Sequence, residues 1–404
     1  MPPLPWHRSP TSPLAVLLAI APPLAVAQFR AMALAVTVAL LLAVVAHWRL
    51  RRAVPWPRPG RTGWLAVGLL GWCLLAALWS LEPARAVQTV GGLAALLLLA
   101  LMASRAVEDD EAAPRRLGLA LAGGLAAGVV LAALDHASGN WLRLAVRGFP
   151  TDMPQISFGL KPAVSLMALL LPLVLAVPTG WVWRGALVVA GLALSLWLPA
   201  DSAKIAAFGG VLAAGAVALL PRLVPRLAAL ALAGFVVAAP LVFAAGLARA
   251  PSLEPLPRSA AHRVLIWDFV VDRIAERPLI GWGMEAARSI PGGSDNFPVE
   301  DLARYGLNSA EARQWFAMPS ARRLPLHTHN ASLQVWLELG LVGTAIAAGL
   351  GAAALLAAGA SPAGFGMAVS AVVTGQLSFG VWQPWWVASV LLAAVVAGAL
   401  GRRR

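Results

Sequence analysis

Two histidines stand directly before a long apolar run in the stretch LPLHTHNASLQVWLELGLVG, residues 324–343. Pro325 favours an extended backbone, and Asn330 is a predicted helix N-cap. His327 and His329 are therefore expected at the mouth of a helix, where the N-terminus favours anions. An imidazole that titrates near neutral pH is suited to act as a general base. The alternative is that both histidines only cap the helix at an interface.

A metal ion at this pair would need at least one further ligand. The remaining histidines form no metal-binding spacing with the pair; they are His7, His47, His136 and His262. The single cysteine, Cys73, lies in an apolar run and excludes an internal disulfide or a cysteine-based cluster. We therefore expect no metal and no cofactor.

The only two lysines of the chain, Lys161 and Lys204, both lie in apolar sequence. A charge within a membrane span costs about 2.5–3.5 kcal/mol at the bilayer centre, and such residues usually serve a function. Both lysines are expected about one turn inside the outer ends of their helices. The alternative is that each side chain snorkels to the interface.

Four arginines gather in a more polar region: Arg263 in AHRVLIW, Arg273 and Arg277 in DRIAERP, and Arg288 in GWGMEAARSIPGG. Guanidinium groups stay charged and bind phosphate oxygens through a bidentate fork. Arg273 is spaced to pair with Glu276, as on a solvated helix face, whereas Arg263 continues an apolar stripe. The chain has no P-loop, no H-E-x-x-H pair and no G-x-S-x-G turn, which argues against nucleotide hydrolysis and serine chemistry.

The composition predicts the scaffold that must hold these residues. Of the 404 residues, 60% are hydrophobic and only 12% are charged, against roughly 25% charged in soluble domains. So few charges cannot coat the surface of several soluble domains, and the apolar content excludes a disordered chain. We therefore expect an all-α polytopic membrane protein.

Apolar runs of about 20 residues, the length that spans a bilayer, predict about twelve transmembrane helices. They lie near residues 12–29, 31–48, 64–80, 86–104, 117–135, 157–177, 181–198, 203–220, 227–247, 330–356, 363–380 and 385–400. The first run ends in an A-x-A-like stretch typical of cleavable signal peptides, but its Pro22–Pro23 pair and weak positive region argue against cleavage. We expect helices 1–9 in residues 1–248, one large periplasmic loop in 249–328, and helices 10–12 in 329–404.

Arginine counts in the short connections predict the orientation, because cytoplasmic loops carry the excess of positive charge. One side holds fifteen arginines and the other only four. Both termini are therefore expected in the cytoplasm, and the 249–328 loop outside. The net charge of +13 would suggest nucleic acid in a soluble protein. Here topology accounts for most of it, so we expect no nucleic-acid partner.

The 249–328 segment is too long for a structureless connection in a compact protein. Its residues Arg263, Trp267, Val270 and Ile274 recur at helical spacing, which predicts an amphipathic helix that stops at Pro278. Beyond that helix, four glycines are expected to let the backbone turn tightly around Arg288. They are Gly281, Gly283, Gly292 and Gly293.

In these stretches the chain resembles the O-antigen ligase and polysaccharide polymerase superfamily of bacterial inner membranes. The resemblance is carried by HRVLIWDFVVDRIAERPLIGWGMEAARSIPGG (262–293) and LPLHTHNASLQVWLELGLVG (324–343). The pattern R-x-x-x-W, then RPL-x-GWG, then an Arg, then H-x-HN-x-x-LQ is specific. The rest of the chain is similar in topology only, with many spans and one large periplasmic loop late in the sequence.

The resemblance implies transfer of a glycan from an undecaprenyl-diphosphate carrier to a hydroxyl acceptor, with inversion and without a metal. It implies that His329 is the general base. It further implies that Arg263 and Arg288 hold the diphosphate of the donor. His327, Asn330 and Gln334 stand in supporting positions of the same motif.

Lys204 and Lys161 depart from the pattern that this superfamily shows. Lys204 stands where many members have Arg in an S-x-x-R or S-R context, and Lys161 where many have Asn-Arg. Each lysine keeps the positive charge but lacks the bidentate fork. We expect both to bind the donor diphosphate, with roles less firm than that of Arg263.

The motifs do not encode the acceptor, which is lipid A core in a ligase, a growing polysaccharide in a polymerase, or a protein in a glycan transferase. A transporter or flippase of an anionic lipid or sugar is the alternative from a different class. It would place functional charges and broken helices near the bilayer midplane, whereas the candidates here cluster at one face. Residues 294–323 are expected to form at most a lid over the acceptor.

Overall fold

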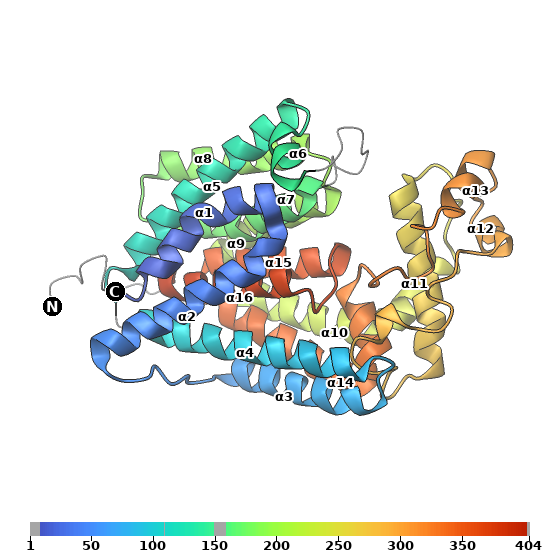
Figure 1. Ribbon diagram of the computed structural model, residues 1–404, viewed down its shortest axis with the longest axis horizontal. Coiled ribbons are helices and arrows are strands. Elements are labelled where there is room, and N and C mark those ends of the chain that lie inside the picture. Colours follow the sequence, from blue (N-terminus) through green and yellow to red (C-terminus); the bar gives the residue numbers. More distant parts are fainter. Residues whose placement is uncertain (1–8, 109, 149–158, 402–404) are drawn as a thin grey trace.

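The computed structural model of the chain describes residues 9–108, 110–148 and 159–401, and the regular structure in these ranges is helical. Long apolar helices lie side by side in a bundle, and helices α11 to α13 stand at one end of it (Figure 1). Helix α1 begins and helix α16 ends at the opposite end (Figure 1). The polar helices are therefore grouped on one side of the bundle.

The first half of the chain supplies α1 Ser12–Gln28, η2 Phe29–Ala31, α2 Met32–Arg51, α3 Arg61–Ala76, η3 Ala77–Trp79, α4 Pro83–Glu108, α5 Ala113–Ala137, α6 Trp141–Arg147, α7 Lys161–Leu170, η5 Leu171–Ala176 and α8 Trp181–Trp197. The second half supplies α9 Asp201–Leu219, α10 Leu223–Leu247, α11 Arg258–Glu276, η6 Ala286–Arg288, α12 Val299–Arg304, α13 Ala310–Phe316, α14 Ala331–Ala358, α15 Pro362–Leu377 and α16 Pro384–Leu400.

Seven helical segments in the described ranges are long and apolar enough to cross a membrane. One of them, Ser12–Arg51, contains both α1 and α2, joined by the short helix η2. Three shorter apolar segments add to these: Lys161–Ala176, Trp181–Trp197 and Pro384–Leu400. The all-α polytopic class is thus supported, while the number of twelve spans stays a prediction.

Helix α1 packs inside the bundle against α5. The two backbones approach closely because Gly124 has no side chain: a Cβ there would lie 2.0 Å from the carbonyl oxygen of Leu18. Just before the helix, the Thr11 hydroxyl donates a hydrogen bond to the buried Asp110 carboxylate at 2.7 Å. The segment with signal-peptide character is therefore part of the bundle core in this fold.

The polar helices at the end of the bundle share an apolar core of their own, and the amphipathic helix predicted from Arg263 is confirmed as α11. The His262 ring of α11 lies edge-on to three aromatic rings, those of Phe297, Trp315 and Phe316. Its Nε2 donates a hydrogen bond to the Arg322 carbonyl at 2.7 Å. Residues 294–323 thus form α12, α13 and their connections, which pack onto α11.

Helix α14 is interrupted at Gly340, whose φ of 64° and ψ of −165° are not helical. The segment 278–283, which contains the GWG sequence, lies against this break. The approach is close on both sides, because a Cβ on Gly340 would lie 2.4 Å from the Leu279 carbonyl and one on Gly281 would lie 2.5 Å from the Glu338 carbonyl carbon. Only glycine fits at these two positions, both with positive φ.

The break leaves backbone groups without helical partners, and neighbouring groups satisfy them. The carbonyls of Leu337 and Glu338 accept from the amides of Trp282 and Gly283, both at 2.9 Å. The carbonyl of Leu339 accepts from the indole of Trp72 at 3.0 Å. On the other side of the break, the amides of Leu341 and Val342 donate to the carbonyls of Pro278 and Leu279, at 2.9 and 3.4 Å. Buried backbone groups need such partners, above all in an apolar surrounding. The RPL-x-GWG sequence therefore completes a broken helix.

Candidate functional site

His327 and His329 converge on one backbone carbonyl, that of Ser378 at the end of α15. The Nδ1 of His329 donates to this oxygen at 2.7 Å, and the Nε2 of His327 donates to it at 3.3 Å. The two rings lie 4.3 Å apart between centroids. Because Nδ1 of His329 carries the proton in this bond, its Nε2 is left with a lone pair.

The turn that carries His329 is fixed by the start of α14. Asn330 is the N-cap, as predicted, and its side-chain oxygen accepts from the Leu333 amide at 2.9 Å. Its amide nitrogen donates to the Gln376 carbonyl at 3.1 Å, which ties this turn to α15. His329 itself has a φ of 55°, a left-handed conformation that is uncommon for a residue with a side chain and is concentrated at functional sites.

Burial and nearby cations keep both imidazoles neutral. Burial is the largest cause that lowers the pKa of His329 well below its ordinary value. The His327 ring and the charges of Arg263 and Lys161 lower this pKa further, whereas the hydrogen bond to Ser378 raises it. Burial, with smaller effects of Lys161, Arg288 and Arg263, lowers the pKa of His327 to about 4. A neutral imidazole at physiological pH is the form that accepts a proton.

The cations that act on these imidazoles are Lys161 of α7, Arg263 of α11 and, for His327, Arg288 of η6. Lys161 begins α7, and its ammonium lies 5.4 Å from the centroid of the Phe379 ring. Burial lowers the pKa of Arg263, although a guanidinium stays protonated. In the part of the chain that the structure describes, neither Lys161 nor Arg263 has a carboxylate within ion-pair distance. Half-buried cations without a carboxylate partner are suited to bind an anion.

The other two predicted cations are already engaged with acids. Arg288 at the end of η6 donates through Nε to Glu285 at 3.1 Å; within the described ranges its two terminal guanidinium nitrogens make no hydrogen bond and remain for another partner. Lys204, in the first turn of α9, pairs with Asp201 at 2.8 Å. The charges of Lys161 and Arg263 thus act on both histidines and that of Arg288 acts on His327, whereas Lys204 has a local carboxylate partner.

The site also depends on residues that the sequence motifs did not indicate. Ser378 supplies the carbonyl that orients both histidines, and Phe379 lies under the Lys161 ammonium. Glu338 is fully buried in α14 and hydrogen-bonded to Gln334 at 3.0 Å. An acidic residue inside a predicted span was a visible signal for Glu338, whereas nothing in the sequence marked a backbone carbonyl.

The described residues around His327 and His329 offer no evident set of metal ligands. In the ranges that the structure describes, no three His, Cys, Asp or Glu side chains gather so that they could hold a metal ion. Metal independence remains an expectation that rests on the resemblance.

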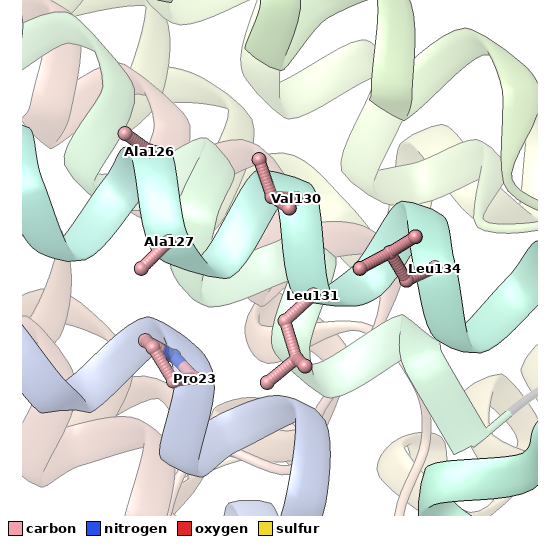
Figure 2. Close-up of a pocket in the computed structure, with 6 residues that line it drawn as sticks. All are labelled: Pro23, Ala126, Ala127, Val130, Leu131 and Leu134. Atoms are coloured by element: carbon pink, nitrogen blue, oxygen red, sulfur yellow. The ribbon is translucent and has the colours of Figure 1, made fainter.

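A long apolar cavity of about 950 Å³ adjoins the site. It follows α15 from Ser361 to Gln376 and Phe379, and residues of α3, α10, α14 and α16 also line it. A second, smaller pocket of about 470 Å³ lies between α1 and α5 (Figure 2). Its lining is entirely apolar: Pro23, Ala126, Ala127, Val130, Leu131 and Leu134. Of these two, the larger cavity approaches the residues around the histidines, because Gln376 and Phe379 line it.

Comparison with known proteins identifies a domain that contains most of this site. Residues 162–348 match the family model described as O-antigen ligase. The match begins one residue after Lys161 and ends before Ser378.

Relatives of similar length are putative polysaccharide ligases of Rickettsia. That of Rickettsia felis is 25% identical over 348 residues, which cover 80% of this chain and 77% of the relative. That of Rickettsia bellii is 27% identical over 346 residues, which cover 81% and 77%. A shorter match, to a putative polysaccharide ligase of Rickettsia prowazekii, is 31% identical over 137 residues, or 32% of this chain and 30% of the relative.

Proposed function

Because the chain belongs to the O-antigen ligase superfamily, we propose that it transfers a glycan from an undecaprenyl-diphosphate carrier to a hydroxyl acceptor. The observation that carries the proposal is the position of His329, whose Nδ1 is held by the Ser378 carbonyl and whose ring lies within range of the charges of Arg263 and Lys161. The donor presents a diphosphate, and the acceptor presents a hydroxyl proton. The site offers groups matched to both.

In the proposed step, Nε2 of His329 takes the proton of the acceptor hydroxyl. The acceptor oxygen forms a bond to the anomeric carbon of the donor sugar. The bond from that carbon to the diphosphate oxygen breaks, and the electron pair leaves with the diphosphate. Attack opposite to the leaving group inverts the anomeric centre. Arg263, Arg288 and Lys161 hold the diphosphate and stabilise its charge as it leaves, and Lys204 assists only when its pair with Asp201 opens.

The large apolar cavity gives the carrier lipid a place within the bundle. Its outer end lies beside Gln376 and Phe379, next to the residues that hold the histidines. A polyprenyl chain in this cavity would bring its diphosphate to the cluster of cations. The energy of the carrier's own phosphate ester bond drives the transfer, so that the chain needs no nucleotide site.

We propose that the protein lies in the bacterial inner membrane with both termini in the cytoplasm and the site facing the periplasm. The arginine asymmetry of the short connections supports this orientation. The position of α11 to α13, at the end of the bundle opposite to the start of α1, also supports it. The corresponding division is residues 1–248 in the membrane, 249–328 in the periplasm and 329–404 in the membrane.

The names of the relatives favour ligation over polymerisation, so we propose lipid A core as the acceptor class and growing polysaccharide as the second candidate. The break in α14 is a feature that a transporter would also have. However, three carbonyls at the break, those of Leu337, Glu338 and Leu339, accept hydrogen bonds from segment 278–283 and from Trp72, so they are engaged within the protein. This difference favours a transferase.

The function is tested by supplying the purified chain with an undecaprenyl-diphosphate-linked glycan and either a lipid A core acceptor or a second lipid-linked glycan. We expect transfer to lipid A core, and Arg263→Lys should raise the donor KM by about 10- to 100-fold. The reason is the loss of a charge-assisted hydrogen bond worth about 1.5–3 kcal/mol. Arg258→Lys, on the same helix but paired with Glu254, is the matched control. Elongation of the lipid-linked glycan alone would favour the polymerase, and no transfer to either acceptor would contradict the proposal.

The pH profile of transfer should show no loss of rate as the pH falls from 8 to 6.5. His329 has a lowered pKa in the folded chain, so it stays neutral below the ordinary value and the rate declines only as the pH falls well below 6.5. The same sign applies to stability: the unfolded histidines take up protons first, so the folded state loses stability below pH 6.5. A rate that halves near pH 6.5 or above would show that His329 is not the titrating base.

A further inference from the structure

Glu338 is a fully buried carboxylate of α14 that the proposed reaction does not use. Its two oxygens accept three hydrogen bonds from three separate segments. Oε1 accepts from the Gln334 side chain at 3.0 Å, and Oε2 accepts from the Glu285 amide at 2.8 Å and from the Trp382 indole at 2.7 Å. A buried acid is costly unless its oxygens are bonded in this way.

One branch of this network leads to the histidines. Gln334 not only donates to Glu338 but also accepts from the Val381 amide at 3.1 Å. Val381 belongs to the turn between α15 and α16, whose first residue, Ser378, supplies the carbonyl that binds both imidazoles. The turn also packs against His327, because a Cβ on Gly380 would lie 3.2 Å from that side chain. Glu338 and Gln334 thus fix the turn that orients His329.

The other branch leads to Arg288. The backbone of Glu285, bonded to Glu338, has a φ of 66° and begins the short helix η6. The side chain of Glu285 accepts from Arg288 Nε at 3.1 Å and from the Thr89 hydroxyl at 2.9 Å. The position of Arg288 therefore depends on the same buried carboxylate that fixes the turn beside the histidines.

We propose that Glu338 is a positioning residue of the transferase site: it holds the Ser378 turn, and with it His329, at a fixed distance from Arg288. The inference rests on the proposed function, because it concerns the general base and the diphosphate of that reaction. Glu338 contacts neither the donor nor the acceptor. It acts through two branches, one to the base and one to the leaving group.

The variants Glu338→Gln and Gln334→Met separate the two branches. In Glu338→Gln the new side-chain NH₂ replaces one acceptor oxygen, so one of the three N–H donors at this position faces another N–H group. If the Gln334 amide turns over to accept from the new NH₂, its own NH₂ then faces the Val381 amide N–H. Gln334→Met keeps the bulk but removes both bonds of Gln334, the one to Glu338 Oε1 and the one from the Val381 amide; the two bonds at Glu338 Oε2, which lead to Glu285 and Trp382, stay in place. The matched control is Thr344→Val, on the same helix, because the buried Thr344 hydroxyl has no hydrogen-bond partner among the described residues.

We expect Glu338→Gln to lower kcat by about tenfold or more and also to weaken binding of undecaprenyl diphosphate, measured by native mass spectrometry. Gln334→Met should lower kcat by a similar factor and leave undecaprenyl diphosphate binding unchanged. Thr344→Val should match the wild type in both. Each variant is first checked for a single folded species by size-exclusion chromatography in detergent.

A wild-type kcat in folded Glu338→Gln overturns the inference, and so does a Gln334→Met variant whose donor binding falls together with kcat. If Glu338→Gln does not fold, the split in Gln334→Met decides alone. Failure of the proposed function looks different, because the wild-type chain itself would then transfer no glycan from undecaprenyl diphosphate. Active wild type with an unaffected kcat in both variants would reject the positioning role only.

Discussion

Replacing His329 with alanine is expected to lower the rate of glycan transfer by a factor of about 10² to 10⁴, the usual contribution of a positioned general base. Among the described residues, alanine removes one side-chain hydrogen bond, to the Ser378 carbonyl, and this carbonyl keeps its bond from His327. The diphosphate-binding cations stay in place. Donor binding should therefore persist while the chemical step is lost.

The measurement is initial transfer rate at saturating donor, together with undecaprenyl diphosphate binding by native mass spectrometry. His136→Gln is a suitable control, because His136 lies at the end of α5 and contacts only the Trp197 ring among aromatic partners in the described chain. A His329→Ala variant within about threefold of the wild-type rate would remove His329 from the role of base. Loss of donor binding in the same variant would assign it to binding and not to proton transfer.

Replacing Gly340 with alanine should have the largest effect on stability. The φ of 64° and ψ of −165° at this residue belong to a region that is essentially restricted to glycine, with a cost on the order of 1–3 kcal/mol for other residues. The new Cβ would also lie 2.4 Å from the Leu279 carbonyl, so segment 278–283 would have to move away. Each buried backbone group that then loses its partner adds about 1–3 kcal/mol.

We therefore expect Gly340→Ala to lose several kcal/mol of stability and transfer activity with it, because Glu285 and Arg288 follow the displaced segment. The measurement is the midpoint of thermal unfolding in detergent, beside the yield of monodisperse protein. Gly349→Ala on the same helix is the control, since a Cβ there meets only Leu65 at 3.8 Å and alanine favours a helix by roughly 0.5–1 kcal/mol. Equal midpoints for the two variants would show that the break is not a requirement of the fold.

The amino-acid sequence by itself determined the membrane class, the amphipathic helix α11 and the N-cap at Asn330. These features depend on local rules: the scarcity of charge over long apolar runs, the period of one helix, and one side chain bonding three residues ahead. The pair of Lys204 with Asp201 obeys a similar local rule and could have been predicted from their spacing. The motif residues were identified through resemblance, and their gathering around His329 agrees with it.

Only the tertiary structure decided how these residues meet. The carbonyl that orients His329 belongs to Ser378, 49 residues further along the chain, and a backbone carbonyl has no signature in the sequence. Gly340 lies in an apolar run that predicts a continuous helix, since glycine is common in transmembrane helices, and the break exists because segment 278–283 supplies the missing hydrogen bonds. Local sequence patterns determine whether a segment is apolar and whether it forms a helix. A site built from distant segments depends instead on which of their polar groups can form hydrogen bonds once the segments pack together.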